Sequence, residues 1–385
     1  MLAHSPPFPI IIDYFHTYGG DLMTEDDVDG IILALKHRDR VRRIRFRTSA
    51  RMTEKIIVPI DGEFSVLEYM CIVPIHDLEI IFPKTFQAPQ LRHLILANFP
   101  YPLKSPLLSA AVGLVGLALV GMRPLTYFQP TELLQRLSLL PQLEILWIGL
   151  KDARPVINFA TPHNSTHISL PNLRFFRFRG YNAYSEALLS RITAPHLEVV
   201  QVSFLEHQTF SVPCLLRFMS TSEDLRLCNA ILILNLEGAR LSVYPNETPK
   251  LSVFDMHVEG VGAMLSVVQI LNTLGPLFSS VVFLTLVHDF DLYCGSYGWP
   301  TTIDWRGLLR SFNNVKILFV GNDVISMLAR SVQSLDEESS NDLLPELKEL
   351  AYYPTKHDSS TPARMQATLL PWFIFKTSLP PPPEW

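Results

Sequence analysis

Residues 140–148 read LPQLEILWI, and the same arrangement returns as LPNLRFFRF at 170–178, APHLEVVQV at 194–202 and APQLRHLIL at 88–96. In each stretch an apolar anchor is followed three and five residues later by two further apolar residues. Side chains alternate between the two faces of a strand, so the second and third anchors point the same way. The stretch therefore predicts a short strand with one buried face.

The same template can be placed along most of the chain. Its spacing, L-x-x-L-x-L at a period of 20–29 residues, is the strand signature of a leucine-rich repeat. Spacings here run from 23 to 34 residues, and the weak members are Leu227 and Val281. Twelve placements start at Val41, Leu67, Leu91, Leu114, Leu143, Leu173, Leu197, Leu227, Leu251, Val281, Val315 and Leu347. Twelve matches in quasi-regular order indicate an array of repeats.

The segments between these strands have helical spacing of apolar residues. We expect helices within 24–35, 130–140, 183–192, 212–219, 263–274 and 305–312. Thr24 followed by three acids is typical of a helix start. A lone repeat buries too little apolar surface to offset its conformational entropy, so the repeats must stack.

The pattern predicts an α/β leucine-rich-repeat solenoid, a horseshoe with parallel strands on the concave face and helices on the convex face. We expect one repeat domain over residues 1–378. Apolar residues 364–375 would close it as a helical C-terminal cap, and residues 379–385 form a Pro-rich tail.

Composition excludes several classes of protein. The 385 residues are 48% hydrophobic and 18% charged, which argues against whole-chain disorder. A net charge of −5 gives no electrostatic case for nucleic acid or an anionic membrane. The cysteines resemble neither a disulfide framework nor a zinc site, because Cys71, Cys214, Cys228 and Cys294 are far apart. We expect a cytoplasmic or nuclear protein.

One apolar stretch raises the question of a membrane span. Residues 105–122, SPLLSAAVGLVGLALVGM, carry no charge over eighteen positions, whereas a span needs about 20 predominantly apolar residues. Leu114, Leu117 and Leu119 fall on the repeat template. The register therefore predicts a helical or turn segment followed by a buried strand, and no membrane association.

Candidate catalytic and metal sites are weak. Residues 25–30 resemble the start of a calcium loop, but Lys36 stands where a bidentate Glu belongs. His163 and His167 have a ligand-like spacing within a stretch that favours a loop. Phosphate-loop, nucleophile-elbow and H-E-x-x-H signatures are missing from the sequence. We expect no enzymatic activity, no cofactor and no metal.

The repeat register instead predicts a binding surface. The fifth template positions project away from the core as a concave stripe: Arg45, Cys71, Ile95, Ala118, Trp147, Arg177, Gln201, Ile231, Asp255, Thr285, Phe319 and Ala351. Trp and Arg are enriched in interface hot spots. We expect partner contacts from Arg43, Arg45, Arg47, Trp147, Phe175, Arg177, Arg179, Gln201, Asp255 and Phe319.

Two other interpretations of this surface stay open. Neighbouring loops would cover Trp147 and Phe175 in one of them. In the other, the three N-terminal arginines form a solvated edge or are neutralised by the acids at 25–29.

Six stretches carry a resemblance to a known family: PIIIDYF (9–15), EDDVDGIILALKHRDRVRRIRF (25–46), FQAPQLRHLIL (86–96), SPLL (105–108), LLQRLSLLPQLEIL (133–146) and FSVPCLLRFMSTSEDLR (210–226). Their amino-acid sequences are similar to the leucine-rich-repeat region of the F-box proteins of mushroom-forming fungi. The resemblance spans most of the chain.

This resemblance implies a function and a set of partners. In such proteins an N-terminal F-box docks on Skp1 of a cullin-RING ubiquitin ligase, and the repeats select the substrate. The present sequence begins almost directly with the strand PFPIIIDY (7–14), so we expect the F-box itself to be missing. We expect a protein partner on the concave face, with Skp1 and a cullin as further candidates. A repeat scaffold or truncated product without ligase linkage, and an enzyme with an unrecognised site, are the alternatives.

Overall fold

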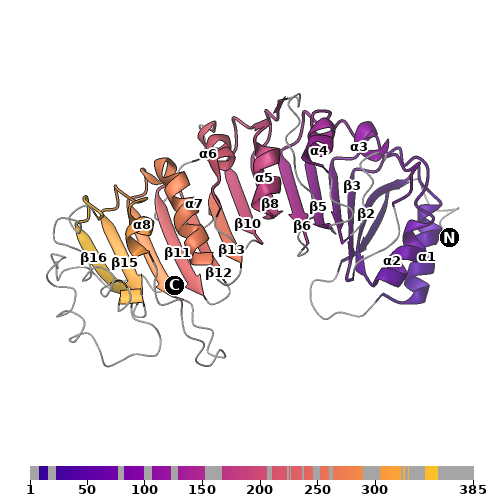
Figure 1. The fold of residues 1–385 in the computed structure, drawn as a ribbon. Helices are drawn as coiled ribbons and strands as arrows, with labels where there is room; N and C mark the ends of the chain where they lie inside the picture. The colour runs from indigo at the N-terminus through magenta and orange to yellow at the C-terminus, as the bar shows by residue number, and fades with distance from the viewer. Residues whose placement is uncertain are drawn as a thin grey trace. The chain divides into compact units, whose positions relative to one another are not determined.

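The chain folds into two compact units in its computed structural model (Figure 1). Unit 1 comprises residues 1–200 and 217–224, and unit 2 comprises residues 201–216 and 225–385. The structure describes residues 8–15, 23–76, 82–98, 106–122, 129–151, 167–205, 210–222, 225, 227–235, 238–245, 252–259, 263–288, 304–321, 324–325, 328 and 343–353. The predicted cap and Pro-rich tail lie outside these residues.

Unit 1 is built on one sheet whose strands follow chain order. Its strands are β1 (Ile10–Tyr14), β2 (Val41–Thr48), β3 (Tyr69–Pro74), β4 (His93–Ala97), β5 (Gly116–Met122), β6 (Ile145–Leu150), β8 (Phe175–Gly180) and the start of β10 (Val199–Phe204). Each neighbouring pair from β1 to β8 is parallel. A second, two-stranded parallel sheet joins β7 (Ile168–Ser169) to β9 (Ile192–Thr193).

Helices connect the strands of unit 1 on one side of the sheet (Figure 1). They are α1 (Glu25–Leu35), α2 (Ala50–Ile57), α3 (Pro106–Ala110), α4 (Pro130–Leu137) and α5 (Asn182–Leu189), while α6 (Pro213–Ser220) lies at the unit boundary. The predicted helices at 24–35, 130–140 and 183–192 are confirmed by α1, α4 and α5, and the segment at 212–219 by α6.

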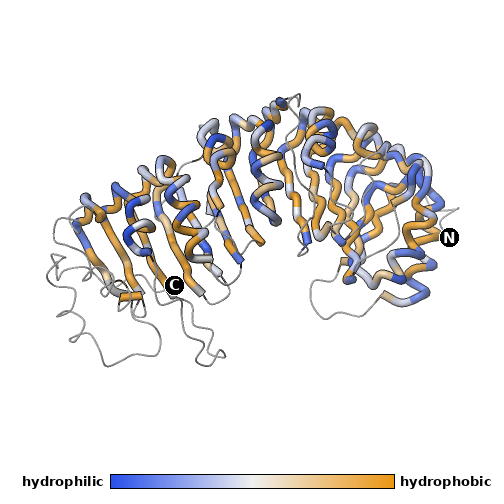
Figure 2. Tube along the Cα trace, viewed as in Figure 1, coloured by the Kyte–Doolittle hydropathy of each residue, from blue (hydrophilic) through white to orange (hydrophobic). Residues whose placement is uncertain are grey.

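The core of unit 1 lies between the sheet and these helices. On the strands that follow the repeat template, the fourth and sixth template positions are buried, as at Leu146 and Ile148 or Phe176 and Phe178. In Figure 2 hydrophobic positions recur along the strands, and hydrophilic positions lie between them on several strands. We call the other side of each sheet, which the helices do not cover, the open face.

The apolar stretch at 105–122 is part of this core. Residues 106–110 form α3 and residues 116–122 form β5, with Leu114, Leu117 and Leu119 buried. Gly121 has a φ of +68°, and the pairing of β5 with β6 shifts register between Leu119 and Met122. The glycine therefore allows a bulge at this point of the strand. No helix among the described residues is long and apolar enough to cross a membrane.

The strands of unit 2 do not follow chain order in the sheet. Its strands, in sheet order, are β13 (Phe254–Glu259), β12 (Gly238–Tyr244), β11 (Asn229–Asn235), β14 (Phe283–His288), β15 (Ile317–Gly321) and β16 (Glu349–Tyr353). Its helices are α7 (Ala263–Phe278) and α8 (Trp305–Leu309), which confirm the helices predicted at 263–274 and 305–312. The pairs β11–β14, β14–β15 and β15–β16 are parallel.

One part of unit 2 departs from the predicted parallel array. β12 was not predicted, and it pairs antiparallel with both β11 and β13. Only residues 236–237 separate β11 from β12, and a parallel connection needs about a dozen residues or more. The short link therefore forces a hairpin, and β13 precedes β11 in the sheet although it follows it in the chain. The weak repeat at Leu227 marks this irregularity.

With that exception the predicted fold class is confirmed. Strands begin within three residues of the anchors in all twelve predicted repeats. The chain is an α/β leucine-rich-repeat array with mostly parallel strands.

Candidate functional site

The predicted partner-binding residues lie on strands in both units. In unit 1, Arg43, Arg45 and Arg47 are on β2, Trp147 is on β6, and Phe175, Arg177 and Arg179 are on β8. In unit 2, Gln201 is on β10, Asp255 is on β13 and Phe319 is on β15. All ten are at least partly accessible to solvent.

Strand register aligns the fifth template positions in each unit. Across unit 1 the paired residues are Asp13, Arg45, Cys71, Ile95, Ala118, Trp147 and Arg177. Across unit 2 they are Asp255, Ser242, Ile231, Thr285, Phe319 and Ala351. The predicted stripe is thus one row of paired residues in each unit, to which β1 and β12 add Asp13 and Ser242.

The row is not evenly accessible. Cys71 and Ala118 are only 4% and 6% exposed, whereas Trp147 is half-buried and Arg177 is exposed. Small side chains lie below their larger neighbours in a row, so the large ones supply the contact area. Burial also raises the pKa of the Cys71 thiol, which disfavours the thiolate that a nucleophile requires.

Trp147 and Arg177 are neighbours on the open face of unit 1. The guanidinium carbon of Arg177 lies 4.3 Å from the centroid of the Trp147 ring, a cation–π contact between β6 and β8. Gly149 follows on β6, and a Cβ there would lie 3.0 Å from Val120 Cγ1. The tryptophan ring is therefore partly exposed and has a cation against its face.

A second cluster occupies the N-terminal end of the same face. Asp13, on β1, lies 3.5 Å from Arg43 Nη2 and 3.7 Å from Arg45 Nη1. Arg43 stacks on Tyr69 at 4.6 Å, and Arg45 stacks on Phe15 at 4.2 Å. Sequence reasoning missed Asp13, although its place in PIIIDYF, one position before the end of β1, was visible.

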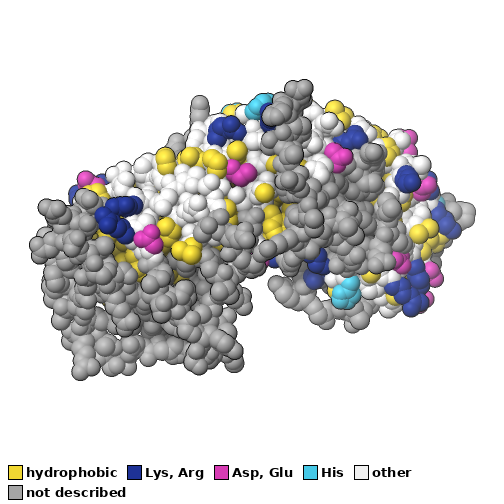
Figure 3. Space-filling model, in the orientation of Figure 1, with side chains coloured by type: hydrophobic (Ala, Val, Ile, Leu, Met, Phe, Trp, Pro, Cys, Tyr) yellow, Lys and Arg dark blue, Asp and Glu magenta, His cyan; other side chains and the backbone are white. Residues whose placement is uncertain are grey.

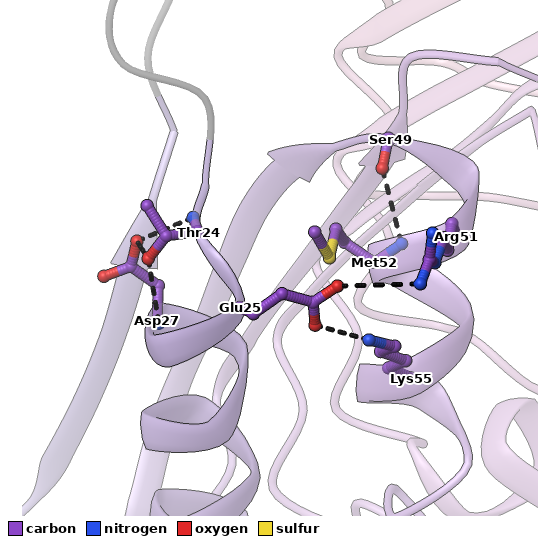
Figure 4. Close-up of polar contacts among 7 residues, drawn as sticks. All are labelled: Thr24, Glu25, Asp27, Ser49, Arg51, Met52 and Lys55. Carbon is purple, nitrogen blue, oxygen red and sulfur yellow. Dashed lines mark hydrogen bonds and ion pairs between the residues drawn. The ribbon is translucent and has the colours of Figure 1, made fainter.

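The acids at 25–29 do not neutralise these arginines. Figure 4 shows Asp27 bound to Thr24 at the start of α1, and Glu25 directed at Lys55 and Arg51 of α2. The hydrogen bond from Lys55 lowers the pKa of Glu25. The acidic start of α1 thus lies beside basic side chains of α2, and Figure 3 shows Lys or Arg side chains close to Asp or Glu at the N-terminal end. The carboxylate beside the β2 arginines is Asp13.

The Asp255 carboxylate in unit 2 already has hydrogen-bond donors within the protein. It accepts hydrogen bonds from Arg240 at 2.9 and 2.5 Å and from the Ser242 hydroxyl at 3.2 Å. The hydrogen bond to Asp255 raises the pKa of Arg240. The Asp255 side chain is 14% exposed and that of Arg240 53%, so Arg240 presents the accessible charge at this point.

Metal sites find no support in the described part of the chain. No group of three or more His, Cys, Asp or Glu side chains is placed to hold an ion there. Residues 25–35 of the calcium-like stretch form α1, so they do not make a calcium loop. His163 lies outside the described residues, so its pairing with His167 stays untested.

Comparisons with known proteins give a structural neighbour of low sequence identity. Neither a known protein family nor a curated protein matches the chain. Among solved structures, the leucine-rich repeat-containing protein LegL7 from Legionella pneumophila matches with 10% sequence identity and a TM-score of 0.29. The match covers 94% of this chain and 96% of that chain.

Proposed function

We propose that this chain is a non-enzymatic recognition module that binds a partner protein through the open face of its strands. The observation that carries this proposal is the Trp147–Arg177 pair at 4.3 Å. A large aromatic ring held by its neighbour loses little side-chain entropy on binding, and Trp and Arg dominate interface hot spots. Phe175 and Arg179 extend the same surface on β8.

We further propose that the partner is a ubiquitin-ligase substrate, and that the chain acts as the substrate-binding part of an F-box receptor. The support is the sequence resemblance to fungal F-box proteins. Skp1 and a cullin would then co-purify with the protein when it acts within a ligase. A scaffold without ligase linkage is the competing function for the same face.

Substitution of the Trp147–Arg177 pair tests the proposed binding surface. We expect Trp147→Asp with Arg177→Glu to abolish recovery of the partners that the wild-type chain captures in quantitative affinity purification. The matched control is Val58→Asp with Arg51→Glu, which changes the net charge equally on exposed residues at α2, where the side chains are 69% and 79% exposed. The circular dichroism melt of both variants should stay near wild type.

Unchanged recovery with the Trp147 and Arg177 variant would place the binding surface elsewhere. A collapsed melt would show that these two side chains belong to the core. Reproducible absence of Skp1 and a cullin from a folded sample that retains its other partners would contradict the ligase linkage alone.

A further inference from the structure

The N-terminal end of the open face of unit 1 has an unbalanced charge. Arg43, Arg45 and Arg47 project from β2, and Asp13 lies beside them on β1. The three arginines and Asp13 together carry a formal charge of +2 in a chain whose net charge is −5. The local sign is therefore opposite to that of the whole protein.

Two other arginines at strand starts in unit 1 lie closer to a carboxylate. Arg42 lies 2.9 Å from Glu68, and Arg174 donates to Glu198 at 2.7 Å. Arg43 and Arg45 instead share Asp13 at 3.5 and 3.7 Å, distances of ion pairs that are longer than ordinary hydrogen bonds. Among the described residues, the Nε atoms of both arginines are buried without a hydrogen-bond partner. Each guanidinium has five donors, so the shared carboxylate leaves most of them unused.

The two guanidinium groups are also held in place. Tyr69 and Phe15 each provide a ring face, at 4.6 and 4.2 Å, and the side chains of Arg43 and Arg45 remain 37% and 31% exposed. Stacking fixes the guanidinium plane and leaves its edge for in-plane N–H donation. Less side-chain entropy is then lost when an acceptor binds.

The surroundings indicate what kind of anion would fit. Asp13 shows that a carboxylate can lie between the two arginines, and Arg forms paired hydrogen bonds with carboxylates. Ile11, opposite Arg43 in the strand register, is 64% exposed and offers an apolar contact next to the charges. Three arginines are few for the phosphate backbone of a nucleic acid, whose affinity depends on many such contacts.

We propose that Arg43, Arg45 and Arg47, with Ile11 beside them, bind an acidic segment of a partner protein in which Asp or Glu alternates with apolar residues. This proposal rests on the proposed function, because it assigns the partner chemistry at one end of the same face. Asp13 competes with the incoming carboxylate and limits its affinity. Removal of Asp13 should therefore strengthen binding, an effect that loss of a structural ion pair would not produce.

The test uses the full chain and a short fluorescein-labelled peptide of alternating Glu and Leu, with the Gln–Leu peptide as its neutral counterpart. Fluorescence anisotropy should show binding of the Glu peptide that weakens with salt, and about tenfold weaker binding of the Gln peptide. Arg45→Gln should weaken binding of the Glu peptide about tenfold, because a charge-assisted hydrogen bond is lost. Asp13→Asn should strengthen binding of the Glu peptide about threefold. The control Arg51→Gln on α2 should leave this binding unchanged.

Several results would overturn the proposal. These are no binding of the Glu peptide at millimolar concentration, equal binding of the two peptides, or weaker binding after Asp13→Asn. Tighter binding of a labelled oligothymidine through the same arginines would favour nucleic acid instead. If Arg45→Gln does not fold, Arg45→Lys keeps the charge without the paired donors and should still weaken binding severalfold. Loss of the acidic-peptide site with intact, Trp147-dependent partner recovery would refute this inference and leave the proposed function standing.

Discussion

The guanidinium group of Arg177 on β8 stacks on the indole ring of Trp147 on β6, with 4.3 Å between the guanidinium carbon and the ring centroid. The two residues are direct partners in the parallel register of these strands. Thirty positions separate them in the sequence, so the contact exists only because one repeat stacks on the next.

This pair should show measurable coupling. In a double-mutant cycle of Trp147→Leu and Arg177→Gln, we expect an interaction energy of about 0.5–1 kcal/mol in the free energy of unfolding, measured by urea denaturation. The matched cycle of Trp147→Leu with Arg179→Gln should give a smaller coupling, because Arg179 pairs with Gly149 rather than with Trp147. Equal coupling in both cycles would refute the specific contact.

Neighbouring residues on β6 test the buried register. Leu146 is fully buried, and its truncation in Leu146→Ala should cost about 2–5 kcal/mol of unfolding free energy. Ile145, the residue before it, is 41% exposed, and Ile145→Ala should cost much less, about 1 kcal/mol. The reverse order in denaturation midpoints would mean that the strand faces the other way.

Gly121 is expected to resist substitution. Its φ is +68°, and a Cβ there would lie 2.2 Å from Asn98 Oδ1 and 3.2 Å from the backbone nitrogen of Asn98. Gly121→Ala should therefore destabilise the protein by about 1–3 kcal/mol. Gly113→Ala is the control, because its Cβ would meet nothing within 4 Å, and its thermal midpoint should stay near that of the wild type. Similar losses at both glycines would contradict this explanation.

The start of α1 depends on Thr24. Its side chain accepts a hydrogen bond from the Asp27 amide at 3.2 Å and donates one to Asp27 Oδ2 at 2.6 Å, while the Thr24 amide donates to the same carboxylate at 2.8 Å (Figure 4). Thr24→Ala should cost about 1 kcal/mol in chemical denaturation, and Thr24→Ser should retain most of the stability. A wild-type midpoint for Thr24→Ala would show that the cap contributes nothing.

The same cap should make stability depend on pH. Hydrogen bonds from Thr24 and Tyr14 hold the pKa of Asp27 below its ordinary value of 3.8. Its contribution is therefore fully present above the unfolded-state pKa and is lost as the pH falls through the lower folded-state value. We expect urea midpoints to fall on acidification below about pH 4, and Asp27→Asn to reduce that slope. An unchanged slope in the variant would exclude Asp27 as a source.

Local patterns explain why most elements were predictable. The spacing of anchors such as Leu143, Leu146 and Ile148 predicts both the strand and its buried face. The register between neighbouring strands follows from these buried positions. Helix α2 was missed, although Ser49 at its N-cap, whose hydroxyl accepts from the Met52 amide, gives a local start signal. β12 was missed because residues 238–244 do not fit the repeat template.

The candidate site was less predictable than the fold. Sequence spacing gave the row that contains Arg45, Trp147 and Arg177, because alternation on a strand is a local property. The spacing does not predict which charged side chains form ion pairs with each other. Asp13 rather than the acids at 25–29 faces Arg43 and Arg45, and Arg240 holds Asp255, since both pairings depend on which strands become neighbours.

The sequence by itself determined the repeat, the buried positions of each strand and the membership of the open face, because these follow from the chemistry of a few adjacent residues. Tertiary structure alone decided which strands lie side by side, and hence the Trp147–Arg177 stack, the Asp13 ion pairs and the place of β12 between β11 and β13. Charge pairs and ring stacking require atoms within a few ångströms, and that proximity is set by packing between distant segments of the chain.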